Sequence, residues 1–206
     1  LNTLAWRVIV ADGPPPPRYY HDVVVFGSEP FVFGGTPDFD GPFLNDLWAF
    51  DLAGETWRLV IGGGPTAPAS RFGGALLATA DDLMMVAGHD STDLGNVNDL
   101  WRVDPSGTWT ETQHGDTLNG RPSGACMFPS DFTIPDLAAP ERRHGFGIAR
   151  GADRSFVVFG KTDCGNANDV WVVNHTSGQW EEIGEASTSG ESCNRNGATE
   201  CTNLCF

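Results

Sequence analysis

The sequence lacks long apolar runs and has little positive charge. No stretch reaches the ~18 consecutive apolar residues that a membrane-spanning helix requires. Only 12 Lys and Arg residues stand against 27 Asp and Glu residues, so the formal net charge is −15. This balance disfavours binding to phosphate backbones or anionic lipid and favours cations or basic partners, although it also serves solubility. We therefore expect neither nucleic-acid binding nor direct membrane insertion.

Patterns typical of catalysis are also scarce. The two tyrosines, Tyr19 and Tyr20, are adjacent, and no glycine-rich phosphate loop leads from a strand into a helix. The five histidines are scattered along the sequence: His21, His89, His114, His144 and His175. The 26 Gly and 14 Pro residues, with 40% hydrophobic residues, indicate a globular, turn-rich chain dominated by strands. No catalytic residue is predicted.

What the sequence does contain is a motif written three times. Asn-Asp-Leu-Trp occurs at 45–48 and 98–101, and Asn-Asp-Val-Trp occurs at 168–171. An Arg and a Gly, always 17 positions apart, precede each motif, and a second Trp follows it. These landmarks are Arg18, Arg71 and Arg143; Gly35, Gly88 and Gly160; Trp48, Trp101 and Trp171; and Trp57, Trp109 and Trp180. Such an array buries its apolar faces by packing each repeat on its neighbours, so we expect the landmarks to be structural.

Each repeat contains four predicted strands. Two short apolar runs lie between the Arg and the Gly, at 23–26 and 31–33 in the first repeat. Because these runs are continuous rather than alternating, we expect both faces of the strands to be covered. The Asn-Asp motif opens a third strand, and the second Trp follows a turn into a fourth. The sequence thus predicts an all-β fold of four-stranded antiparallel sheets, each a blade of a β-propeller.

The landmarks resemble those of the kelch repeat: an Arg before the first strand, a Gly doublet closing the second, and two spaced Trp residues. Gly34-Gly35 is the full doublet, whereas Ala87-Gly88 and Phe159-Gly160 keep only the second glycine. That retained glycine is expected to need positive φ or close backbone approach. The resemblance implies a closed ring of roughly five to seven blades. Three repeats therefore predict an incomplete ring, with other blades supplied by a longer chain or an assembly partner.

The landmarks also divide the chain. The predicted parts are 1–12, the outer strand of a preceding blade with Trp6; 13–60 and 61–112, two kelch blades; 113–184, a third blade with an insertion of about twenty residues at 120–141; and 185–206, a Cys-rich tail or the start of a following module. Arg121 could also begin the third blade. Arg143 is preferred because it preserves the 17-residue spacing.

The cysteines suggest disulfides. The candidates are Cys126, Cys164, Cys193, Cys201 and Cys205. Strand order places Cys126 and Cys164 on one face, where they could be bridged or remain unpaired thiols that behave as small hydrophobes. The last three lie in a polar tail, which favours a disulfide-bonded module in an oxidising location. A zinc knuckle is the alternative, but the tail has no nearby His to bind zinc.

Asn174 adds a second argument about location. Asn174-His175-Thr176 matches the acceptor pattern for N-glycosylation, in a turn between a third and a fourth strand. Together with the cysteines it predicts an extracellular or cell-surface protein. A cytoplasmic location is the alternative.

Other chemistry is weighed against structural roles. Acidic loops with Asp38 and Asp40, and with Asp90, Asp93 and Asp99, suggest calcium, but the Glu expected at the twelfth loop position is missing. No cofactor is therefore expected, and calcium stays the one candidate. The three Arg landmarks are expected to satisfy carbonyls between blades, with a ring of anion ligands as the alternative. The Trp landmarks are expected to pack between blades rather than form a carbohydrate platform.

These observations predict a non-catalytic protein-interaction or scaffold module of a larger secreted or cell-surface kelch propeller protein. Its protein partner would bind the face that carries the 120–141 insertion and the loops at 36–44 and 89–97, since loops on rigid scaffolds carry recognition. The alternatives are an intracellular kelch adaptor in a cytoskeletal or ubiquitin-ligase assembly, and an enzyme whose site lies in other blades. Self-assembly through open blade faces also remains open.

Overall fold

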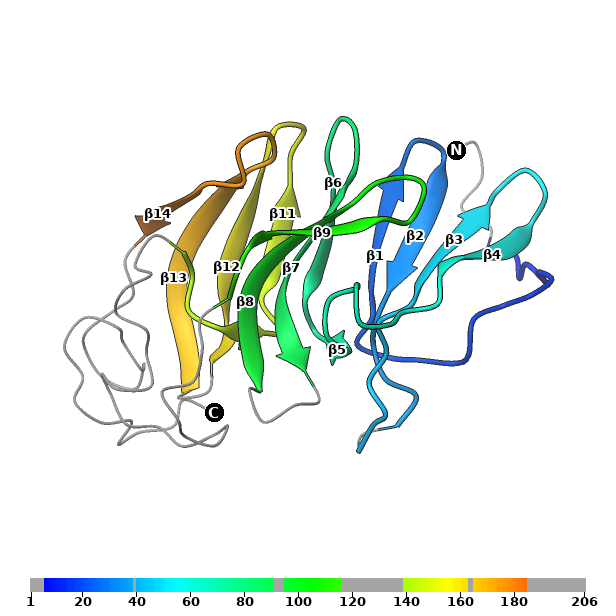
Figure 1. Cartoon of the computed structure of the whole chain (residues 1–206), viewed down its shortest axis with the longest axis horizontal. Coiled ribbons are helices and arrows are strands. Elements are labelled where there is room, and N and C mark those ends of the chain that lie inside the picture. The colour runs from blue at the N-terminus through cyan, green and yellow to red at the C-terminus, as the bar shows by residue number, and fades with distance from the viewer. Residues whose placement is uncertain (1–5, 39, 91–94, 116–138, 163–164, 185–206) are drawn as a thin grey trace.

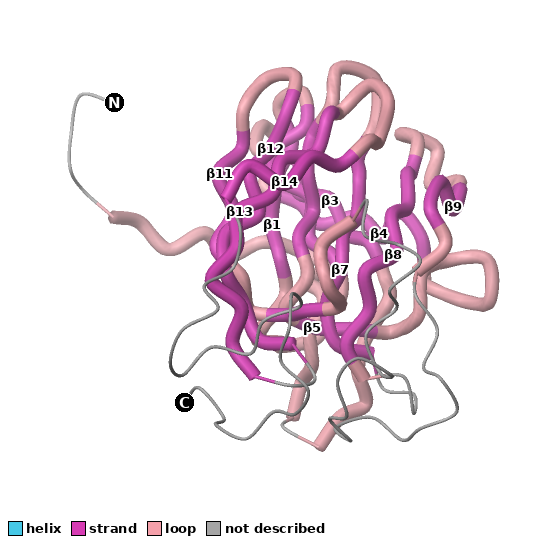
Figure 2. The backbone as a smooth tube through the Cα atoms, turned by 90° about the vertical axis from the view of Figure 1, so that its left-hand side faces the viewer, coloured by secondary structure: helices cyan, strands magenta, loops and turns pink. Residues whose placement is uncertain are grey.

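The computed structural model describes residues 6–38, 40–90, 95–115, 139–162 and 165–184. Within these ranges every regular element is a β-strand, and Figure 2 shows only strand and loop colours. No helix among the described residues is long and apolar enough to cross a membrane. The all-β prediction is confirmed.

Three antiparallel sheets stand next to one another (Figure 1). The first contains β1 (Asp22–Phe26), β2 (Glu29–Phe33), β3 (Leu47–Asp51) and β4 (Thr56–Ile61). The second contains β5 (Arg71–Phe72), β6 (Ala75–Ala78), β7 (Leu83–Asp90), β8 (Asn96–Val103) and β9 (Trp109–Gln113). The third contains β10 (Arg143–His144), β11 (Gly147–Arg150), β12 (Arg154–Thr162), β13 (Gly165–Asn174) and β14 (Trp180–Gly184). We call these sheets blades 1, 2 and 3.

The first strand of blades 2 and 3 is divided in two, which the sequence did not predict. The break begins at a residue with left-handed backbone, Gly73 at φ 63° or Gly145 at φ 61°, and Tyr20 at φ 56° occupies the same position in blade 1. Gly73 N donates to Tyr20 O, and Gly145 N donates to Gly73 O, both at 2.9 Å. The backbone at these breaks therefore links the three blades at one end of the molecule.

Two apolar clusters fill the spaces between blades. Between blades 1 and 2, Trp109 packs with its ring centroid 5.2 Å from that of Phe33. Between blades 2 and 3, Trp180 packs on the equivalent cluster. Both faces of blade 2 are thus covered. In blade 1, Val23 and Val25 are 47% and 59% exposed, so the prediction that both faces are covered is wrong for this blade within the described residues.

The glycine doublet follows β2 in blade 1 and lies within β7 and β12 in blades 2 and 3. Its first residue has positive φ in all three blades: 64° at Gly34, 55° at Ala87 and 63° at Phe159. The retained glycines also have positive φ, and a Cβ added to Gly88 would lie 3.1 Å from Phe72 O. The strand register shifts at this point in blades 2 and 3. In blades 2 and 3 the doublet is therefore a β-bulge. Its backbone favours glycine in all three blades, although Ala and Phe occupy its first position in two of them.

The predicted boundaries outside the sheets are only partly described. Residues 6–11 form no strand, and Trp57 N donates to Asp12 O at 3.0 Å. The outer strand of a preceding blade stays a prediction. Most of the 120–141 insertion and the whole 185–206 tail lie outside the described residues.

Candidate functional site

Each blade contains a buried Arg held by the Asp of the repeated motif. The Arg Nη2 atom lies 2.9, 2.7 and 2.7 Å from an Asp oxygen in the pairs Arg18–Asp46, Arg71–Asp99 and Arg143–Asp169. The motif Trp donates its indole N–H to the same carboxylate, at 2.6, 2.8 and 2.8 Å in the three blades. One carboxylate in each blade therefore joins the segment that carries the Arg to the segment that carries the motif.

This geometry corrects the predicted role of the arginines. Arg71 Nη1 donates to Ala87 O at 3.1 Å, and Arg18 and Arg143 make the equivalent bond in their own blades. The carbonyls that they satisfy thus lie within a blade, not between blades. The arginine side chains are only 3%, 1% and 0% exposed, and Asp46, Asp99 and Asp169 neutralise them, so they are not free to form a ring of anion ligands.

The same contacts hold the Asp46 carboxylate ionised. Burial alone would raise the pKa of Asp46, but hydrogen bonds from Arg18 and Trp48, with the Arg18 charge, outweigh it and lower that pKa. The Asp residues are functional parts of the scaffold that the sequence did not single out as partners of the arginines.

The Asn of the motif connects successive blades. Asn45 Nδ2 donates to Pro68 O, and Asn98 Nδ2 donates to Pro140 O, both at 3.0 Å. Each acceptor proline lies three residues before the Arg of the next blade. The three motif residues therefore have different roles. The Asn donates to the next blade, the Asp binds the Arg, and the Trp donates a further hydrogen bond to the Asp.

Beside this scaffold, three cross-strand pairs line a pocket of about 590 Å³. The pairs, one from each blade, are Tyr19–Thr36, Phe72–His89 and His144–Lys161. The first member of each pair directly follows the scaffold Arg, and the second directly follows the second position of the glycine doublet. The repeat thus brings equivalent positions together, and different side chains occupy them.

The pocket has a continuous aromatic wall centred on Phe72. Its ring centroid lies 4.9 Å from Phe43, 5.6 Å from Tyr20 and 5.4 Å from His144. The His89 ring stacks on it at 5.0 Å with an interplanar angle of 16°. Blade 1 supplies Phe43 and Tyr20, so the wall exists only where neighbouring blades meet.

Both histidines are oriented by oxygen acceptors. His144 Nδ1 lies 2.6 Å from Asn96 Oδ1, and His89 Nδ1 lies 2.8 Å from Asp90 O. We assign a proton to Nδ1 in each ring, and in a neutral ring this leaves Nε2 as an acceptor. Burial, and then the charges of His89 and Lys161, lower the pKa of His144 to about 4. His144 is therefore neutral at physiological pH.

Charge is distributed unevenly around the pocket. No Asp or Glu side chain is among its described lining residues, and Lys161, the single lysine of the sequence, lines it from blade 3. On the blade 1 side, partial burial and then Asp38, Tyr20 and Asp40 raise the pKa of Tyr19. The pocket therefore has a cation on one side and carboxylates beyond the other.

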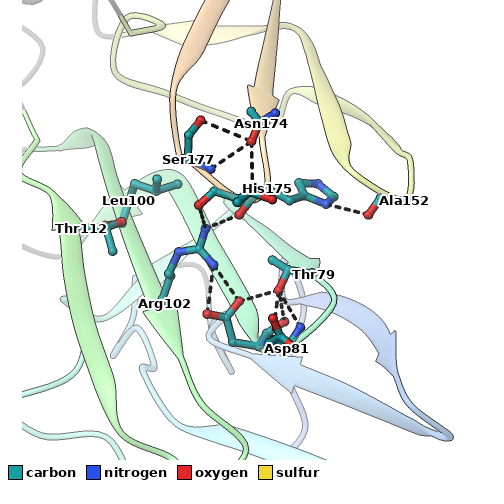
Figure 3. A network of polar contacts seen from close by, with 11 residues as sticks. Thr79, Asp81, Leu100, Arg102, Thr112, Ala152, Asn174, His175 and Ser177 are labelled. Atoms are coloured by element: carbon teal, nitrogen blue, oxygen red, sulfur yellow. Dashed lines mark hydrogen bonds and ion pairs between the residues drawn. The ribbon is translucent and has the colours of Figure 1, made fainter.

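The opposite end of the blades is closed by polar contacts (Figure 3). Arg102 Nη1 lies 2.9 Å from an oxygen of Asp82, and Nη2 donates to the carbonyls of His175 and Thr176. These bonds tie blade 2 to the β13–β14 turn of blade 3. Polar contacts therefore connect blades 2 and 3 at this end, whereas the pocket lies at the other end, where Phe72 of β5 lines it.

Other predicted sites are not assembled by the described residues. No group of three His, Cys, Asp or Glu residues that could hold a metal occurs among them, and Asp99 is bound by Arg71 and Trp101. Asp93 and all five cysteines lie outside the described residues. Calcium binding stays an alternative to the expectation of no cofactor, and the disulfides stay predictions.

Asn174 and the tryptophans can be placed. Asn174 is exposed at the end of β13, and its Oδ1 accepts hydrogen bonds from Thr176 N and Ser177 N, both at 2.9 Å. Its glycosylation stays a prediction. Trp109 and Trp171 are buried, so they pack rather than offer a platform for carbohydrate.

Known proteins resemble the chain in this architecture. The family model of the KLHDC2/KLHL20/DRC7 Kelch-repeats domain matches residues 1–134. The leucine-zipper-like transcriptional regulator 1 homolog of Drosophila melanogaster is 28% identical over 189 residues, which is 87% of this chain and 17% of that protein. Human kelch domain-containing protein 3 is 29% identical over 121 residues, which is 54% of this chain and 31% of that protein. The chain thus spans less than a third of either relative.

A solved structure gives the same fold. The structure of YjhT superposes with a TM-score of 0.59 at 13% identity, covering 84% of this chain and 54% of that one. Likeness at this identity concerns the fold alone. Since the family model covers most of the chain, and each blade carries the same Arg, glycine and Trp landmarks, the chain belongs to the kelch-repeat family and forms blades of a kelch β-propeller.

Proposed function

We propose that this chain is a protein-interaction module that holds its partner at the pocket shared by the three blades. A kelch domain is a module for binding other proteins. The observation that carries the proposal is the lining of the pocket: positions equivalent in the repeat carry Tyr, Phe and His in one series and Thr, His and Lys in the other. A rigid repeated frame with varied side chains at its mouth is suited to recognition.

The same observation favours the predicted partner face. The pocket residues Thr36, Phe43 and His89 belong to the predicted loops 36–44 and 89–97 or border them. His144 and Lys161 come from the blade that follows the insertion. We therefore retain this face as the docking surface, with the pocket rather than the insertion as its described centre.

A non-catalytic role is the second part of the proposal. None of the described lining residues forms a nucleophile–base pair. The Ser155 Oγ–His175 Nε2 contact of 2.9 Å resembles such a pair, but the two residues are 0% and 3% exposed and lie away from the pocket. Substrate has no access to them, so we assign them a structural role.

The third part is an intracellular adaptor role. The expectation of a secreted or cell-surface protein receives no support from the relatives, one of which is described as a transcriptional regulator homolog and another as a kelch domain-containing protein. These relatives favour the adaptor alternative. Thiol titration of the denatured full chain tests it: five free thiols support an intracellular protein, and protected cysteines support the secreted alternative.

Selection of binding peptides tests the docking surface. A random peptide library displayed on phage is selected against the full chain, and the affinities of selected peptides are measured for wild type, Tyr19→Ala and Lys161→Ala. Leu52→Ala is the matched control, because Leu52 is an exposed side chain in the β3–β4 turn at the opposite end. We expect the two pocket substitutions to weaken binding and the control to leave it unchanged. Equal binding to all four proteins would refute the proposed surface.

A further inference from the structure

We propose that the pocket selects an aromatic side chain that has a carboxylate close to it, so that the partner presents an acidic peptide with a Tyr or Trp anchor. This proposal deepens the interaction function above and rests on it. It follows from three properties of the pocket: the shape of its wall, the hydrogen-bonding state of its histidines, and the position of its one lysine.

The wall is suited to a flat ring. Phe43, Phe72 and His144 meet at large interplanar angles, 82° between Phe43 and Phe72 and 69° between Phe72 and His144, so the wall offers both ring faces and ring edges. Aromatic pairs gain most in such edge-to-face and offset arrangements. The volume of about 590 Å³ exceeds that of one ring and leaves room for the flanking peptide backbone.

The histidines favour a ring that carries a hydrogen-bond donor. Because Nδ1 of His89 and of His144 donates to a protein oxygen, Nε2 is the acceptor that remains on the neutral His144 ring. The phenol O–H of Tyr and the indole N–H of Trp can donate to it, whereas Phe has no donor. Tyr or Trp should therefore bind more tightly than Phe.

Lys161 decides the sign of the neighbouring charge. It lines the pocket from blade 3, and none of the described lining residues carries a carboxylate. On the blade 1 side, Asp38 and Asp40 raise the pKa of Tyr19. A carboxylate of the partner is therefore favoured on the blade 3 side and disfavoured on the blade 1 side. The peptide should lie with its acidic residue towards Lys161.

The overall charge of the chain acts in the opposite direction. A formal net charge of −15 repels an acidic peptide and favours a basic one, whose cation could lie over the pocket rings. At physiological ionic strength, however, charges more than about 8 Å apart are largely screened. The contact with Lys161 then dominates, and the acidic peptide is the better partner.

The peptides selected above supply the probes. Replacing the aromatic anchor by Leu should weaken binding on the order of 30-fold, the effect of losing a central hot-spot contact. Replacing the neighbouring Glu or Asp by its amide should weaken binding about three- to five-fold, because Lys161 is exposed. A peptide with Lys in place of that acid should bind Lys161→Glu better than wild type.

Each outcome decides something. Selected peptides that depend on Tyr19 and Lys161 but are basic, or lack an aromatic residue, overturn this inference and leave the interaction function intact. If the Lys-containing peptide binds Lys161→Glu no better than wild type, the acidic residue of the partner does not contact Lys161. If no selected peptide depends on the pocket residues, both this inference and the proposed docking surface fail.

Discussion

Removing the charge of Asp99 is the sharpest test of the repeated scaffold. Its carboxylate accepts hydrogen bonds from Arg71 Nη2 at 2.7 Å and from Trp101 Nε1 at 2.8 Å, and the two ion-paired side chains are only 1% and 12% exposed. Asp99→Asn keeps the shape of the side chain but leaves the Arg71 charge buried without a counter-ion. Breaking a buried pair in this way costs about 3–5 kcal/mol. Since Arg71 keeps its bonds to Ala69 O and Ala87 O, we expect about 3 kcal/mol.

Urea unfolding followed by tryptophan fluorescence measures this change in the free energy of unfolding. Asp82→Asn is the matched control, because the Arg102–Asp82 pair has the same chemistry but its side chains are 22% and 20% exposed. The control should cost about 1 kcal/mol or less. If Asp99→Asn costs no more than Asp82→Asn, the claim that the buried pair holds the blade together is wrong.

A double substitution separates the pair from its surroundings. Arg71→Met combined with Asp99→Leu removes both charges at once and should be less destabilising than Asp99→Asn, because no unpaired charge remains buried. The loss of unfolding free energy is also measured for Arg71→Met and for Asp99→Leu alone. The difference between the loss in the double variant and the sum of these two losses gives the coupling energy of the pair. A coupling energy near zero would contradict the geometry.

Three further predictions concern other parts of the molecule. Gly34→Ala should destabilise the chain by more than about 1 kcal/mol in urea unfolding, because its φ is 64° and a Cβ would lie 2.7 Å from Arg71 O; unchanged stability would show that the bulge can relax. Because the pKa of His144 is about 4 in the folded state and about 6.5 in the unfolded state, the unfolded state binds its proton first, so stability should fall as pH drops from about 6.5 to about 4. His144→Phe should remove this slope, and substitution of the exposed His114 should not. Arg150→Met should cost about 1 kcal/mol by thermal unfolding, since Arg150 pairs with Asp22 of blade 1 and donates to Leu76 O of blade 2; no loss would mean that this contact does not join the blades.

The fold could be predicted because each landmark has the same structural role at the same position of every repeat. The second glycine of the doublet needs positive φ, the motif Asn reaches the next blade, and the Trp residues bind the Asp or fill the space between blades. These requirements are local or repeat at one interval, so the spacing of a single sequence displays them. The partner of the Arg was missed because the Asp lies 26 to 28 residues further along the chain, and its role shows only in three dimensions.

The pocket could not be predicted in the same way. Its residues stand directly after the landmarks, but their types differ between blades, so alignment of the repeats gives no signal there. His89 and His144 are far apart in the sequence, yet their rings lie 5.3 Å apart. They meet because the position after the glycine doublet of one blade lies beside the position after the Arg of the next.

Photo-crosslinking tests most directly whether a partner is held at the pocket. A benzophenone amino acid replaces Tyr19, Lys161 or Leu52 in the full chain, and each protein is irradiated with a peptide selected against the wild type. Positions 19 and 161 line the pocket, and position 52 lies at the opposite end. We predict peptide adducts from positions 19 and 161 and none from position 52. Adducts from position 52, with none from the pocket, would contradict the proposed function.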